Sequence, residues 1–148
     1  MNASNRLKPI KKLADNKEKA SAQALGHSVN NKHCQQEKLQ QLIQYRAEYI
    51  ASMTHKTEQG MFGDQLQQYH LFLNKLDNAI SQQQSAVEVS EQGLANSKDE
   101  WRESNTRANA ISRVIGNLES KEKYQKNKKE SAQLDELSTQ AFLRSKRL

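Results

Sequence analysis

The second half of the chain repeats an apolar residue every seven positions. All members of this first track are apolar: Leu66, Leu73, Ile80, Val87, Leu94, Trp101, Ala108 and Ile115. A companion track, three residues further on, is apolar at both ends and small or polar between them: Tyr69, Leu76, Gln83, Ser90, Ser97, Ser104, Ile111 and Leu118. A strict seven-residue repeat kept over this length is typical of a left-handed coiled coil. We therefore predict a helix over 64–129, followed by a frayed tail over 130–148.

The first part of the chain shows a less complete helical pattern. Its clearest seam predicts a helix over 7–57 and consists of Ala22, Leu25, Val29, Lys32, Gln36, Leu39, Ile43, Arg46, Ile50 and Met53. Leu7, Ile10 and Leu13 follow a different phase, so a stutter is expected near Lys17. Pro9 is compatible with this helix because it falls in the first turn, where its missing N–H is not needed.

Residues 58–63 are predicted to reverse the chain. Gly60 and Gly63 supply the unusual backbone angles of a tight turn, and Asp64 is placed to cap the second helix. Short connections join antiparallel helices. The predicted fold is all-α, an antiparallel two-helix coiled-coil hairpin that forms a single domain over 1–148. Residue i should lie near residue ~122−i, so a C-terminal helical tail beyond Gly116 overhangs.

The composition is unlike that of an ordinary globular domain. Only 34% of residues are apolar, against a usual ~45–50%, which leaves either a disordered chain or long helices that bury a narrow seam. The heptad repeat favours the helices. Cys34 has no second cysteine to pair with, no apolar run reaches ~18 residues, and the first 19 residues lack the apolar stretch of a signal peptide. These features predict a cytoplasmic protein without membrane insertion.

The net charge of +6 is concentrated at the chain ends. Residues 1–19 hold six basic and two acidic side chains (+4), residues 121–148 hold eight and four (+4), and the middle is therefore −2. The hairpin would bring the two basic segments toward one end. Such charge suits an acidic partner or nucleic acid. Nucleic acid is disfavoured because four acidic residues offset the charge of the C-terminal segment and few aromatic residues accompany it.

A second stripe lies roughly 90° from the seam on both helices, at ~100° per residue. It consists of Leu42, Tyr45 and Tyr49 on the first helix and Phe72, Ala79 and Gln83 on the second, with Leu76 bridging seam and stripe and with Lys38 added as the residue expected beside Gln83. The predicted register places Tyr49 beside Phe72, Tyr45 beside Leu76, Leu42 beside Ala79, and Lys38 beside Gln83. Two interpretations stay open: an exposed partner surface, or a broad core whose tyrosine hydroxyls reach solvent.

Nothing in the sequence indicates catalysis, a metal site or a cofactor. The histidines and Cys34 show no His-x3-His or Cys-x2-Cys spacing. No phosphate-binding loop, dinucleotide fingerprint or nucleophile elbow occurs. A two-helix hairpin also offers no cleft that excludes water. We therefore expect a protein that is not an enzyme and that acts by binding.

The chain resembles the flagellar FliJ family over nearly its whole length. The resemblance rests on the order and spacing of "LKPIKKLADNKEKA", "QEKLQQLIQYRAEYIASM", the glycine turn, "LQQYHLFLNKLDNAISQQ", "WRESNTRANAISRV" and "KKESAQLDELSTQAF". The family implies a component of the flagellar type III export apparatus. By this resemblance it would be a coiled-coil escort chaperone that associates with the export ATPase FliI, docks on the export gate FlhA and meets export chaperones. Such a protein would be peripheral to the cytoplasmic face of the inner membrane.

By this resemblance, the gate-binding residues are those of the second stripe, from Lys38 to Gln83. Candidate contacts with the ATPase ring are Lys8, Lys11 and Lys12, which project where the termini meet. Two alternatives stay open: a stalk or regulator of another ring ATPase or type III secretion system, and a nucleic-acid-associated coiled coil, which would bind with a steep salt dependence.

Overall fold

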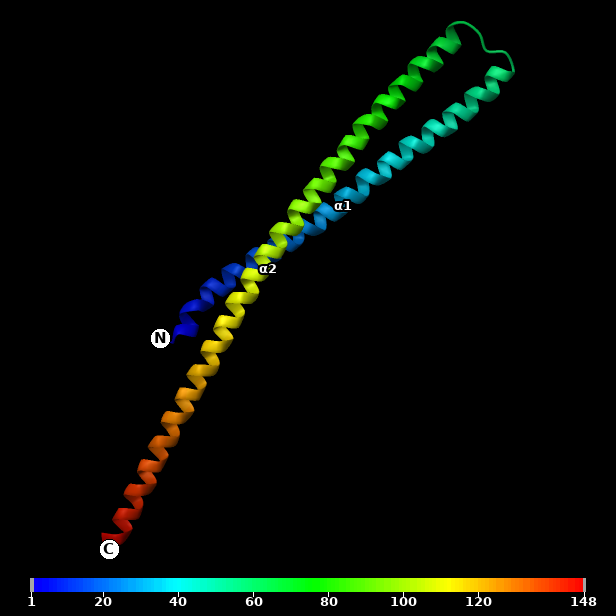
Figure 1. The fold of residues 1–148 in the computed structure, drawn as a ribbon. Coiled ribbons are helices and arrows are strands. Elements are labelled where there is room, and N and C mark those ends of the chain that lie inside the picture. Colours follow the sequence, from blue (N-terminus) through cyan, green and yellow to red (C-terminus); the bar gives the residue numbers. More distant parts are fainter. Residues whose placement is uncertain (1, 148) are drawn as a thin grey trace. The chain divides into compact units, whose positions relative to one another are not determined.

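The computed structural model describes residues 2–147, and these form two long helices. Helix α1 spans Ala3–Glu58 and helix α2 spans Asp64–Arg147 (Figure 1), with no strand among the described residues. The helices pack against each other through side-chain hydrogen bonds: Ser4 bonds to Glu122, Ser28 to Ser97, and Arg46 to Asp77. As the residue number on α1 rises, the number of its partner on α2 falls. The pairing is therefore antiparallel, and the predicted all-α helical hairpin is confirmed.

The chain divides into two compact units. One unit comprises Met1–Lys19 and Glu103–Leu148, and the other comprises Ala20–Arg102. Each unit contains part of both helices. The single domain expected over 1–148 stays a prediction.

The α2 seam lies where the sequence places it. Every member of both predicted tracks, from Leu66 to Leu118, is buried or half-buried. The most enclosed members are Leu76, Ser90, Leu94, Ser104, Ala108 and Ile115. Serine is accommodated because small side chains let the partner helix approach closely. The hydroxyl of Ser90 also donates to the Val87 carbonyl at 2.6 Å.

The predicted α1 seam is only half right. Leu25, Lys32, Leu39, Arg46 and Met53 form one track, but the other track is Leu7, Ala14, Ser21, Ser28, Gln35, Leu42 and Tyr49. Val29 and Ile43, which were predicted to be buried, are 47% and 42% exposed. The same seven-residue phase extends back to Ser4, so no stutter occurs near Lys17.

Polar pairing explains why the less apolar track of α1 faces α2. The Ser28 and Ser97 hydroxyls share a hydrogen bond of 2.7 Å. The Gln83 amide donates to the Gln35 backbone carbonyl at 2.9 Å and to its side-chain oxygen at 2.8 Å. Gln83 and Ser97, two members of the polar stretch of the α2 companion track, therefore meet matching polar groups on α1, and these half-buried groups are satisfied.

The turn between the helices uses both glycines as predicted. Gly60 has a φ of 105° and Gly63 a φ of 70°. Residues with a Cβ atom rarely adopt such positive φ angles. The Gly63 carbonyl accepts the first α2 hydrogen bond from the Gln67 N–H at 3.2 Å. Gly63, not Asp64, therefore occupies the cap position, and Asp64 begins the helix as an acidic residue favoured by its dipole.

Both helices extend beyond the predicted limits. α1 begins at Ala3 instead of about residue 7, and its contact with α2 reaches Glu122, so the overhang starts after that residue. α2 stays helical to Arg147, where a frayed tail was expected from residue 130. The sequence after Gly116 contains neither glycine nor proline, so nothing in it breaks the helix. All residues from 123 to 147 are exposed.

Candidate functional site

An aromatic cluster joins the two helices in the unit that contains the turn. It consists of Tyr45 and Tyr49 on α1 and Tyr69 and Phe72 on α2. The Tyr49 ring lies 4.6 Å from the Phe72 ring and 5.5 Å from the Tyr69 ring, measured between centroids. The Tyr45 ring meets Phe72 edge-on at 6.3 Å. These are favourable aromatic geometries, so the cluster links α1 to α2.

The members of the second stripe differ greatly in exposure. Leu76 is buried at 6% exposure, whereas Tyr45 is 49% exposed. Lys38 is also exposed. The remaining members are half-buried: Leu42, Tyr49, Phe72, Ala79 and Gln83. The stripe is therefore not a separate exposed surface. Tyr45 and Lys38 form its accessible edge, beside the exposed parts of the half-buried members.

Within the stripe, the predicted pairing of Tyr49 with Phe72 is confirmed, and Gln83 has a different partner from the one predicted. Tyr49 packs on Phe72 as expected, and Tyr45 also contacts Phe72. Gln83 bonds to Gln35, one turn away from the expected Lys38. Leu42 and Tyr49 belong to the seam, so their position off the seam was wrongly predicted. The roles of these residues in partner binding stay predictions.

An ion pair borders the aromatic cluster and was missed from the sequence. The Arg46 Nε donates to the Asp77 Oδ1 at 2.6 Å, and both side chains are partly exposed. Arg46 was assigned to the seam, but its partner was not identified. An arginine in a seam position directly after Tyr45 was the signal that could have prompted a search for an acidic residue on α2. Exposed pairs contribute little stability, so the pair orients the helices more than it holds them together.

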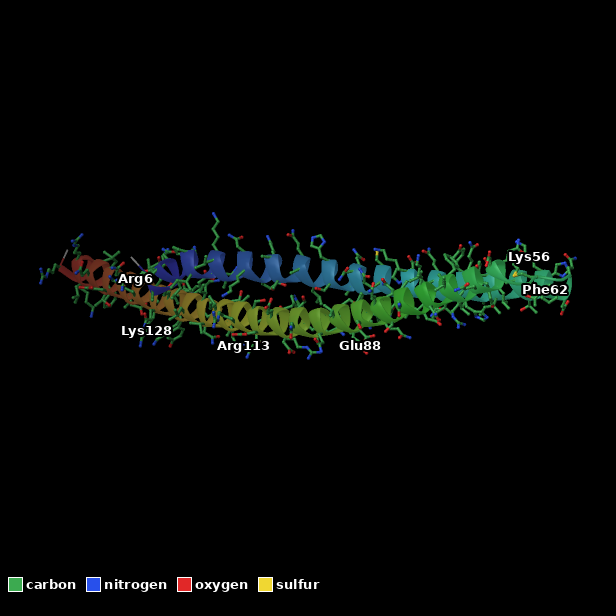
Figure 2. The ribbon with its side chains drawn as sticks, turned by 90° about the horizontal axis from the view of Figure 1, so that it is seen from above. Arg6, Lys56, Phe62, Glu88, Arg113 and Lys128 are labelled. Atoms are coloured by element: carbon green, nitrogen blue, oxygen red, sulfur yellow. The ribbon has the colours of Figure 1, made fainter. Side chains whose placement is uncertain are left out.

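The turn adds an exposed aromatic residue that the sequence reading passed over. Phe62 is 84% exposed, although the neighbouring Met61 is only 7% exposed. Phe62 lies in the loop that follows α1 (Figure 2), and Lys56 lies in the last turn of that helix. Because a lone exposed aromatic residue is common in soluble proteins, Phe62 by itself defines no site.

The three candidate lysines of the basic end lie in different surroundings. Lys11 forms an ion pair with Asp15 at 3.1 Å, whereas Lys8 and Lys12 are exposed. In the same unit, the Glu122 carboxylate accepts hydrogen bonds from the Ser4 hydroxyl and from the Ser4 backbone N–H. These bonds, with a further contribution from the Lys8 charge, hold the pKa of Glu122 below its usual range.

The described part of the chain offers neither a cluster of metal ligands nor a membrane span. Among the described residues, no three or more His, Cys, Asp or Glu side chains are grouped as metal ligands. No described helix is long and apolar enough to cross a bilayer. The cluster has an exposed aromatic edge at Tyr45, a feature suited to binding another protein.

The chain matches the model of a known protein family. The model of the family described as "Flagellar FliJ protein" matches residues 3–147, almost the whole chain. No curated relative and no solved structure matches it.

Proposed function

Because the chain belongs to the FliJ family of flagellar export components, we propose that it is an adaptor that links the export ATPase FliI to the export gate FlhA. In this role it also escorts export chaperones, and it works by binding instead of catalysis. It acts from the cytoplasmic side, peripheral to the inner membrane at the export apparatus.

The observation that carries the gate contact is the position of Tyr45. Its ring is about half exposed, and one edge packs against Phe72, which in turn packs against Tyr49. A partner that covers Tyr45 therefore gains aromatic area that is already held in place. Little side-chain freedom remains to be lost, which favours binding. Aromatic residues in such positions often account for 2 kcal/mol or more of binding energy.

The other members of the stripe have a supporting role in this proposal. Leu76 is buried and Leu42 and Tyr49 are half-buried, so they set the spacing of the helices and the orientation of the exposed edge. Lys38 lies one heptad before Tyr45 on the same face and is exposed. Lys38 and Tyr45 would contact the gate directly, together with the exposed parts of Phe72, Ala79 and Gln83.

The ATPase contact is proposed for the basic segment at the start of α1. Lys8 and Lys12 are exposed and therefore available to an acidic surface of the ATPase. Lys11 is engaged with Asp15, so it would contribute only if that ion pair opened. Contacts of this type steer association and weaken as salt rises.

The test compares binding of the full chain to the two partners. Tyr45→Ala should weaken binding to the cytoplasmic part of FlhA by roughly tenfold or more, the effect of ~1.4 kcal/mol, while binding to FliI stays unchanged. Tyr124→Ala is the matched control because Tyr124 is 68% exposed and lies in the other unit. Equal losses for both tyrosine variants, or a loss of FliI binding with Tyr45→Ala, would contradict the proposed division of contacts.

A further inference from the structure

The last part of α2, residues 123–147, carries apolar side chains that the hairpin does not cover. Leu134, Leu137, Phe142 and Leu143 are 64%, 61%, 59% and 51% exposed. Helix α1 begins at Ala3. Every described residue after Glu122 is exposed. This helix therefore presents its apolar side chains to solvent.

Leu134, Leu137 and Phe142 do not continue the seam of the hairpin, whereas Leu143 falls in the seven-residue phase of Ile115. The tail stripe, spaced three and four residues apart, consists of Ser131, Leu134, Ser138, Ala141 and Ser145, with Leu137 and Phe142 at its edges. At ~100° per residue, its centre lies roughly 140° around the helix from the seam positions Ile115, Leu118 and Glu122. A longer α1 would consequently not cover the tail stripe. Its spacing fits a different helix as partner.

The small residues of the tail stripe favour a protein helix over a lipid bilayer. The other members of the stripe, three serines and Ala141, are small, which lets another helix approach closely beside Leu134. An interfacial membrane helix needs a broad bulky apolar face. Here only Leu134, Leu137 and Phe142 are bulky, and the two edge residues lie about 140° apart on the helix.

The charge of the tail selects among protein partners. Residues 123–147 hold seven basic and three acidic side chains, a net charge of +4. The basic groups stand at both ends of the segment, in "KYQKNKK" before the tail stripe and "RSKR" at its end. The Lys146 ammonium also lies 4.9 Å from the centroid of the Phe142 ring, at the edge of the stripe. Two copies of this tail would place like charges opposite each other in either orientation, which disfavours self-pairing.

We propose that residues 123–147 are a docking helix for an amphipathic helix of another protein, one whose apolar face is flanked by acidic residues. The tail stripe supplies the apolar contact, and the lysines and arginines at its two ends select the acidic partner. Figure 2 shows Lys128 in this segment, with its side chain pointing away from the helix. The docking helix uses none of the residues assigned to the gate or the ATPase, so it is independent of those contacts.

Photo-crosslinking in intact flagellated cells tests this proposal. Benzoylphenylalanine replaces Leu134 in the full chain or, as the matched control, Leu143, which is similarly exposed but lies roughly on the opposite side of the helix. Adducts are digested and the joined peptides are identified by mass spectrometry. We expect the Leu134 position to give about tenfold more adduct than the Leu143 position, as expected when one face carries the contact. The joined peptide should be a net-negative helical segment of another protein.

A charge-reversal variant makes the test specific. Lys126→Glu, Lys128→Glu and Lys129→Glu combined should lower the Leu134 adduct by about tenfold, because the charge pairing is removed. Tyr45→Ala should leave the adduct unchanged, which separates this contact from the gate. Adducts to lipid, to a second copy of the chain or to a basic segment would overturn the proposal. So would equal yields at the two positions, or no adduct at either.

Discussion

Ser4, in the first turn of α1, donates two hydrogen bonds to the Glu122 carboxylate on α2. The Ser4 backbone N–H lies 3.1 Å from Oε1, and the Ser4 hydroxyl lies 2.6 Å from Oε2. The first N–H groups of a helix have no acceptor within the helix. Glu122 provides one from the neighbouring helix, and its negative charge suits the helix N-terminus. This contact fixes the point where the pairing of the two helices ends.

We expect Glu122→Ala to release the start of α1 while leaving the rest of the hairpin folded. Removal of the carboxylate leaves the Ser4 N–H and hydroxyl without their acceptor. Hydrogen exchange at the first turns of α1 should therefore become severalfold faster. Glu119→Ala is the matched control because Glu119 is exposed and lies almost one turn earlier on α2. Equal exchange rates in both variants would contradict a capping role for Glu122.

The same contact predicts a dependence on pH. The Ser4 hydroxyl, the Ser4 N–H and then Lys8 stabilise the ionised carboxylate, so the pKa of Glu122 is lower in the folded chain than in the unfolded chain. The contribution of this contact to stability is therefore complete above the unfolded pKa of about 4.3, and it is lost as the pH falls through the lower folded pKa. Carboxyl NMR titration of Glu122 should show a higher midpoint in Ser4→Ala than in the unchanged chain. An identical midpoint would show that Ser4 does not stabilise the carboxylate.

The two glycine environments predict opposite effects of the same substitution. Gly63→Ala should destabilise the hairpin by about 1–2 kcal/mol, because a φ of 70° brings a Cβ close to the backbone. Gly93→Ala should stabilise it by roughly 0.5–1 kcal/mol, because Gly93 is inside α2 and an added Cβ meets nothing within 4 Å. Urea unfolding of both variants measures the difference. A stabilising effect of Gly63→Ala would mean that the turn adopts another conformation.

Periodicity predicts the α2 seam but not the whole of the α1 seam. In α2 the first track is apolar at every heptad position, so hydrophobicity alone identifies it. In α1, Val29 is more apolar than Ser28, yet Ser28 faces the partner helix because Ser97 offers it a hydrogen bond. A polar pair across a seam is visible only when both helices are known. The choice between adjacent tracks therefore depends on the partner helix, which the pattern of one helix does not contain.

The candidate site, too, was predicted from the sequence only in part. The Tyr49–Phe72 pair was predicted, since a register counted outward from the glycine turn is accurate near that turn. The partner of Gln83 was displaced by one turn because the polar contact with Gln35 overrode the counted register. The helical tail was underestimated for another reason. Its sequence contains no helix breaker, but its stripe has Leu134 as its one bulky apolar member among small residues, so hydrophobicity alone does not mark it as a helix.

The two neighbouring tyrosines of α1 should separate stability from binding. Tyr49 is half-buried and packs on both Tyr69 and Phe72, so Tyr49→Ala should destabilise the hairpin by about 2–3 kcal/mol. Tyr45 is 49% exposed and its ring contacts only Phe72 among the aromatic rings of the described chain, so Tyr45→Ala should cost within about 1 kcal/mol. Thermal unfolding of the two variants, followed by circular dichroism, measures these values.

Gate binding by the same two variants completes this prediction. Tyr45→Ala should bind FlhA poorly although it melts almost like the unchanged chain, because only an exposed contact is lost. Tyr49→Ala should lose gate binding in proportion to its loss of folded structure, and lower temperature should restore part of it. If Tyr45→Ala instead melts as early as Tyr49→Ala, Tyr45 is part of the core. The loss of gate binding in Tyr45→Ala could then not be separated from its loss of stability, and the exposed edge of the cluster would have no residue that contributes to gate binding alone.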